Sequence, residues 1–163
     1  GVCVVANDNN QGNVVISGAK AAVDAAIEKA KELGARAIPL NVSAPFHCPL
    51  MQPAADEMAE ALAAATIIAP RAPLVANVVA RPVHDPEEVR RLLVEQVTGR
   101  VRWRESIQWM AETVEKGGGG VSMFVETGAG KQLAGMVKRN APEATTVALN
   151  VPGDLEAFAK SLG

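Results

Sequence analysis

Short apolar runs alternate with segments of helical spacing through most of the chain, and this order limits the folds open to it. The pattern predicts strands at 74–79, 121–126 and 145–149, and helices at 50–65, 85–97, 103–115, 131–140 and 155–162. Such alternation is typical of an α/β protein in which helices pack around a mainly parallel sheet. The helix start at 85–88 is the strongest local signal, because a capping aspartate precedes a proline and two acidic residues.

The first forty residues follow a different order. The pattern predicts strands at 2–5, 14–16 and 35–40, a polar turn at 7–12 and a helix at 19–33. This β-β-α-β order is typical of the second half of a split βαβ unit, whose first half would lie before Gly1. Because strand-like residues follow Gly1 at once, we expect that residues to its left have been cut away or are encoded elsewhere.

Composition excludes several classes of protein. The 163 residues are 48% hydrophobic and 21% charged, which favours a packed core over disorder. A net charge of −2 argues against a general nucleic-acid binder. The sequence has no apolar run long enough to cross a membrane, and no charged-then-apolar segment stands at its start, so we expect no secretion. Cys3 and Cys48 make neither a disulfide framework nor a metal-knuckle spacing. We therefore expect a cytoplasmic location.

His47 is the most informative residue, because it stands in a proline-fixed loop between an expected strand and an expected helix. Histidine exchanges a proton near neutral pH, so His47 is a candidate general base or acid beside a nucleophile. The alternative is a structural histidine packed near Phe46 and Pro45. His84, at a helix entry, is expected to be a solvated surface residue.

Three amide side chains have two readings each. Gln96 lies on the apolar side of its helix, where it either turns to solvent or marks a helix end whose backbone carbonyl orients a neighbour. Asn7 and Asn9 either position a ligand carbonyl or form a turn. Pattern alone favours solvent for Gln96 and turn formation for the two asparagines.

Other candidate motifs favour structural roles. The turn at 128–131 (GAGK) lacks both the first glycine and the Ser/Thr of a P-loop, which favours a tight strand-to-helix turn. Cys48 neighbours His47, but adjacent extended residues point opposite ways, so a buried structural thiol is favoured over a nucleophile. Basic residues form patches that are either solvated or meet an acidic protein partner: Arg100, Arg102, Arg104, Lys138 and Arg139.

Several segments together resemble the C-terminal half of malonyl-CoA:acyl carrier protein transacylases, over nearly the whole chain. They are residues 7–18 (NDNNQGNVVISG), 43–48 (SAPFHC), 50–56 (LMQPAAD), 77–78 (NV), 96–103 (QVTGRVRW) and 126–135 (ETGAGKQLAG). The histidine segment with its proline–alanine continuation is the most specific of them.

The resemblance implies an α/β fold: part of an α/β-hydrolase-like acyltransferase domain with the second half of a ferredoxin-like subdomain. Residues 1–41 would belong to the small subdomain and residues 42–163 to the C-terminal part of the large one. It also implies a malonyl transfer from malonyl-CoA to the phosphopantetheine of acyl carrier protein in fatty-acid synthesis, with no metal or redox cofactor. Malonyl-CoA and phosphopantetheine would be substrates.

The resemblance also assigns roles to residues. A serine in a Gly-x-Ser-x-Gly elbow attacks the thioester, and His47 takes and returns its proton. The backbone carbonyl of Gln96 would orient His47, and Phe46 would select malonyl over branched groups. Asn7 and Asn9 match asparagines that border the active-site cleft.

The chain departs from the family in one decisive respect: it contains no Gly-x-Ser-x-Gly elbow. The oxyanion glutamine loop and the arginine that binds the malonyl carboxylate are absent too. We therefore expect the N-terminal half of the domain to be a required partner and this chain alone to be inactive. The alternatives are a non-catalytic interaction module and an acyltransferase that uses the Cys48 thiol.

Overall fold

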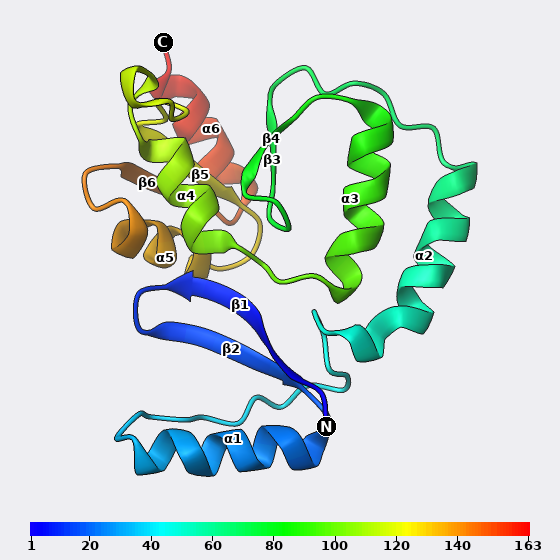
Figure 1. The fold of residues 1–163 in the computed structure, drawn as a ribbon. Helices are drawn as coiled ribbons and strands as arrows, with labels where there is room; N and C mark the ends of the chain where they lie inside the picture. Colours follow the sequence, from blue (N-terminus) through cyan, green and yellow to red (C-terminus); the bar gives the residue numbers. More distant parts are fainter. The chain divides into compact units, whose positions relative to one another are not determined.

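The computed structural model describes residues 1–163 and divides into two compact units, residues 1–103 and 104–163 (Figure 1). Its mixture of helices and strands confirms the α/β class. This division concerns packing within the chain, and the subdomain boundary expected near residue 41 stays a prediction. None of the helices is long and apolar enough to span a membrane.

The first unit opens with an antiparallel hairpin of β1 (Cys3–Asn10) and β2 (Asn13–Gly18). The polar turn predicted at 7–12 is wrong, because β1 continues to Asn10 and only residues 11 and 12 turn. Pairing with β2 holds the polar residues in the strand, and Asp8 and Asn10 are buried. The polar residues of this stretch gave no sign of a strand in which two of them, Asp8 and Asn10, are buried.

The helix predicted at 19–33 is confirmed as α1 (Lys20–Glu32), which packs against both strands of the hairpin (Figure 1). The strand predicted at 35–40 is wrong, because these residues form no ladder. A strand needs a neighbouring backbone for its hydrogen bonds. Every second residue from 38 to 42 nevertheless has a large apolar side chain that is exposed: Ile38 by 62%, Leu40 by 58% and Val42 by 58%.

The rest of the first unit carries the helices that frame the site. A short 3₁₀ turn, η1 (Pro49–Met51), leads into α2 (Gln52–Ala64), and α2 packs against α3 (Pro86–Thr98) (Figure 1). The predicted start of α3 is confirmed, since the Asp85 carboxylate accepts from the Glu88 N–H at 2.8 Å. Leu92 of α3 and Ala55 of α2 are buried.

A second hairpin, of β3 (Leu74–Ala76) and β4 (Arg81–Val83), replaces the single strand predicted at 74–79. The chain reverses through residues 77–80, where Ala80 takes a φ of 52° and its N–H donates to the Ala76 carbonyl at 2.7 Å. The sequence shows no glycine there to signal the reversal.

The second unit follows the predicted β-α-β order. After α4 (Trp103–Ala111), which begins at the boundary, come η2 (Val114–Lys116), β5 (Met123–Thr127), α5 (Gln132–Asn140), β6 (Thr145–Leu149) and α6 (Pro152–Ser161). The expected mainly parallel sheet is wrong for this chain: β5 and β6 pair in parallel, but the other two sheets are antiparallel hairpins, one of them formed where the chain reverses at residues 77–80. Ile107, Val137 and Leu149 are buried in this unit.

Candidate functional site

His47 lies in a tight turn immediately before η1. Its φ is 57°, in the left-handed region that non-glycine residues seldom occupy. Hydrogen bonds fix the backbone on both sides of the ring: the Phe46 N–H donates to Ala44 at 3.0 Å, and the Met51 N–H donates to Cys48 at 3.0 Å. Strained conformations of this kind persist where the surrounding structure imposes them, and they cluster at active sites.

The imidazole of His47 meets the end of α3. Its Nδ1 lies 3.0 Å from the backbone oxygen of Gln96, so the structure brings together two residues that are 49 positions apart. A carbonyl oxygen only accepts, so Nδ1 must carry the proton and Nε2 keeps a free lone pair. The half-buried ring is thus held in the tautomer that a general base needs.

The Gln96 carbonyl is available because α3 ends two residues later, at Thr98. The last four carbonyls of a helix have no intrahelical partner, and they carry the partial negative charge of the helix end. A histidine bonded there has an acceptor for its Nδ1–H and lies at the end of the helix that carries partial negative charge. The site therefore suits a ring that gains a proton on Nε2 during a reaction.

The side chain of Gln96 closes the same helix end. Its Nε2 donates to the Gly99 carbonyl at 2.9 Å, and the Gly99 N–H donates to Glu95 at 2.8 Å. A Cβ at Gly99 would come within 2.7 Å of both the Glu95 oxygen and Val78 Cγ2. The expectation that Gln96 turns to solvent is therefore wrong, since its half-buried amide braces the turn that presents its own carbonyl.

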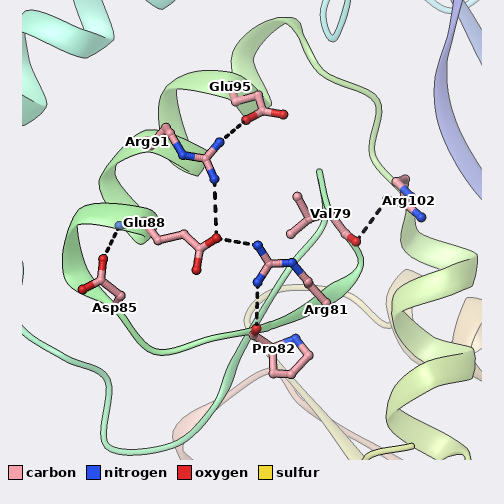
Figure 2. A network of polar contacts seen from close by, with 8 residues as sticks. All are labelled: Val79, Arg81, Pro82, Asp85, Glu88, Arg91, Glu95 and Arg102. Carbon is pink, nitrogen blue, oxygen red and sulfur yellow. Dashed lines mark hydrogen bonds and ion pairs between the residues drawn. The ribbon is translucent and has the colours of Figure 1, made fainter. Parts of the chain in front are cut away.

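The residues after Gly99 are tied to both hairpins. Val101 pairs with β1: its N–H donates to Ala6 at 2.8 Å, and its carbonyl accepts from Asp8 at 2.9 Å. The Arg102 N–H donates to Asn77 at 3.0 Å, and its guanidinium donates to the Val79 carbonyl at 3.0 Å (Figure 2). Arg102 is half-buried, and its guanidinium is bonded to a backbone carbonyl within the chain.

A ladder of ion pairs runs along the side of α3 that faces Arg81 (Figure 2). Glu88 pairs with Arg81 of β4 and with Arg91, and Arg91 reaches Glu95 at 2.8 Å. Exposed pairs of this kind contribute little individually. Their position nevertheless joins the β3–β4 hairpin to the helix that carries Gln96.

The other predicted site residues lie around this pair in different ways. Phe46 is next to His47 with 46% of its surface exposed. Asn7 and Asn9 lie on β1, half-buried, so both are strand residues rather than turn formers. His84 is exposed, as predicted. The Cys48 side chain is fully buried, also as predicted, which counts against its use as a nucleophile.

The glycine turn in the second unit is closed. The Glu126 carboxylate accepts from the N–H groups of Leu133 at 3.2 Å and Ala134 at 2.8 Å, while Asn150 accepts from the Gly130 N–H at 2.7 Å. These amides would have to be free to bind a phosphate. The prediction of a tight turn is therefore confirmed, and the part played by Glu126 was not visible in the sequence.

A second carboxylate closes the start of α6. Asp154 accepts from the N–H of Asn150 at 2.8 Å and from that of Val151 at 3.1 Å. These two backbone hydrogen bonds, that of Asn150 first, lower the pKa of the exposed Asp154 carboxyl below its usual value.

One small cavity adjoins the site. About 200 Å³ lies between the β3–β4 hairpin and α3, lined by aliphatic side chains such as Val75, Val83 and Leu92, and by Gln96. The described chain contains no group of three or more His, Cys, Asp or Glu residues placed to hold a metal ion.

Comparison with known proteins gives a consistent result. The malonyl CoA-acyl carrier protein transacylase of Salmonella typhimurium is 43% identical over 152 residues, which are 93% of this chain and 47% of that protein. Its Bacillus subtilis counterpart is 40% identical over 159 residues, 97% of this chain and 48% of that protein. The chain thus spans about half the length of the curated relatives it matches. No family model matches it.

Solved structures agree. An acyl-carrier-protein S-malonyltransferase from Bartonella henselae superposes with a TM-score of 0.91 at 46% identity, covering 100% of this chain and 50% of that one. A malonyl-transacylase in complex with a type II PKS acyl-carrier protein gives a TM-score of 0.88 at 36% identity. The match covers 98% of this chain and 50% of the chain in that structure.

Proposed function

Because this chain is homologous to the C-terminal half of malonyl CoA-acyl carrier protein transacylases, we propose that it supplies the base of a malonyl transferase. The serine nucleophile would come from a segment outside these 163 residues. One observation carries the proposal: the 3.0 Å contact between His47 Nδ1 and the Gln96 carbonyl, which leaves Nε2 free to accept a proton.

In the proposed reaction, Nε2 of His47 takes the serine hydroxyl proton as the oxygen attacks the malonyl thioester. The Gln96 carbonyl and the negative end of α3 stabilise the imidazolium that forms. The carbon–sulfur bond breaks, and the imidazolium returns the proton to the departing thiolate of coenzyme A. The phosphopantetheine thiol of acyl carrier protein then takes the malonyl group from serine in the reverse sequence.

Phe46, Asn7 and Asn9 have proposed supporting roles. The exposed ring of Phe46 stands beside His47, where its bulk would leave little room for a branch on the α-carbon of the acyl group. Asn7 and Asn9 would border the cleft from β1. The reaction would belong to fatty-acid synthesis in the cytoplasm and use no metal or redox cofactor.

The proposed protein partner is acyl carrier protein, since one structural neighbour is a malonyl-transacylase bound to such a carrier. Lys138 and Arg139, exposed in the last turn of α5, offer positive charge to an acidic carrier. Reversing both charges should weaken binding to acyl carrier protein and make that binding less sensitive to salt. The same change at Lys29 and Lys31 of α1, which already pair with Glu32 and Glu28, is the control.

The second proposed partner is the N-terminal half of the domain. The exposed row of Ile38, Leu40 and Val42 has the alternation of a strand without a neighbour, and a partner that pairs with it would cover it. The test is malonyl transfer to acyl carrier protein by this chain, by the N-terminal half of a relative, and by their mixture. We expect transfer by the mixture alone.

A non-catalytic interaction module is the second candidate function, and the same exposed row favours it. In that case this chain should bind the N-terminal half tightly, and a dye that binds its apolar surface should be displaced. The mixture should then show no malonyl transfer. Robust transfer by this chain alone would contradict both candidates.

A further inference from the structure

Cys48 is a buried group that the proposed reaction does not use. Its side chain is 0% exposed, and its Sγ lies 3.1 Å from the Pro45 carbonyl oxygen. A thiol donates to a carbonyl, so this contact is an S–H···O hydrogen bond between residues three apart. Its burial withholds the sulfur from substrates and reagents, but it leaves a mechanical role.

The S–H···O bond spans the turn that contains His47. The two residues between Pro45 and Cys48 are Phe46 and His47, so the bond closes a loop around the one strained backbone conformation of the segment. A left-handed φ at a non-glycine residue is unfavourable by itself, because Cβ approaches the following carbonyl. The contacts that flank it must therefore hold it in place.

The same turn sets the position of the ring. Beyond it, Cys48 accepts from the Met51 N–H at 3.0 Å and so starts η1, which packs against α3. Cys48 is thus bonded backward through its thiol and forward through its carbonyl, with His47 immediately before it. If the backward bond were lost, His47 could relax to an ordinary φ, and its Nδ1 would leave the Gln96 carbonyl.

We propose that Cys48 is a positioning residue for His47: its thiol holds the Pro45 carbonyl and so keeps His47 in the conformation that places Nδ1 on the Gln96 carbonyl. The importance of this role for catalysis rests on the proposed function. The role itself concerns only the geometry of this chain.

The test reads the His47 tautomer in the purified chain by ¹⁵N NMR of its imidazole nitrogens. Wild type should show the proton on Nδ1. Cys48→Ala and Cys48→Val both remove the donor, one with a smaller and one with a larger side chain, and each should shift the tautomer ratio toward Nε2–H by about fivefold. Cys48→Ser keeps a donor and should retain the wild-type ratio.

Two controls separate positioning from general loss of structure. Cys3→Ala makes the same chemical change at a half-buried cysteine on β1 and should leave His47 unchanged. The exposed His84 should keep one spectrum in every variant. Thermal unfolding identifies any variant that fails to fold. If either Cys48→Ala or Cys48→Val fails to fold, the other still tests the proposal, because their side chains differ in volume.

The outcomes are distinct. A wild-type tautomer ratio in a folded Cys48→Ala or Cys48→Val chain would overturn the proposal, as would a Cys48→Ser chain that behaves like Cys48→Ala. Because the spectrum needs neither serine nor malonyl-CoA, failure of the transfer assay with a normal His47 signal would count against the proposed function alone.

Discussion

Two helix ends in this chain treat their unpaired backbone groups in opposite ways. The C-terminal end of α3 gives the Gln96 carbonyl to a histidine, a side chain that can gain and lose a proton. The N-terminal end of α5 gives its amides to Glu126, a carboxylate on the preceding strand. Both ends are satisfied, but only the first is bonded to a side chain that keeps a proton-accepting atom unbonded.

This difference distinguishes a candidate catalytic site from a helix cap. The glycine turn at 128–131 has the sequence appearance of a ligand cradle, yet its amides already have partners within the chain. The end of α3 has no glycine-rich signature before Gly99, yet it orients the only candidate base. The distinction lies in the bonding capacity that remains: His47 is bonded through Nδ1 alone and keeps Nε2 as a proton acceptor, whereas both carboxylate oxygens of Glu126 accept from backbone N–H groups.

The largest effect, on the rate of malonyl transfer, is expected from removal of the His47 imidazole. His47→Ala in the chain combined with the N-terminal half should lower malonyl transfer about 10²- to 10⁴-fold, because it removes the general base. The rate of transfer to acyl carrier protein is the measurement. His84→Ala, at an exposed histidine, is the matched control and should leave the rate unchanged.

The next effect concerns the glycine that allows α3 to end as it does. Gly99→Ala should lower the free energy of unfolding by about 1–3 kcal/mol, because its Cβ would collide with Glu95 and Val78. Gly135→Ala within α5 meets nothing within 4 Å and should instead raise stability by about 0.5–1 kcal/mol. Urea denaturation of the two chains checks the opposite signs, and equal shifts would contradict this account of Gly99.

A smaller effect on stability is expected at the start of α5, where Glu126 accepts from the backbone N–H groups. Glu126→Gln leaves one oxygen to accept where the carboxylate offers two and removes a charge from the start of α5. The loss should be about 1–2 kcal/mol of unfolding free energy, with malonyl transfer by the surviving folded fraction unchanged. Glu143→Gln, at an exposed position in a turn, is the control for loss of charge alone. A specific loss of transfer in folded Glu126→Gln would mean that this turn belongs to the site.

The smallest effect depends on pH. Backbone hydrogen bonds lower the pKa of Asp154 in the folded chain, so its contribution to stability is present above the unfolded value near 3.8 and is lost as the pH falls through the folded one. Asp154→Asn should therefore lower the melting temperature slightly at pH 7 and flatten its decline below pH 4, where the two chains converge. An unchanged decline in acid would contradict this assignment.

Local signals predicted the helices well. The cap at Asp85 located the start of α3, and apolar spacing located α1 and the parallel pair β5–β6. Predictions failed where structure depends on a neighbour. The polar stretch of β1 is a strand because β2 pairs with it, and residues 35–40 are not a strand because nothing in the chain pairs with them.

The pairing of His47 with Gln96 followed from family resemblance, since a separation of 49 residues gives no local signal. The supporting contacts could not be predicted in the same way. The bond from the Gln96 amide to Gly99 and the bond from Cys48 to Pro45 depend on how a helix end and a turn close, which single residue types do not encode. Burial of Cys48 was predicted, but its place in a hydrogen bond was not.

The most direct measurement of the central claim is the ¹⁵N NMR spectrum of the His47 imidazole in the wild-type chain at neutral pH. The account predicts a proton on Nδ1, held by the Gln96 carbonyl, and an unprotonated Nε2. A spectrum with the proton on Nε2 would contradict it, because the nitrogen required as the base would already be occupied.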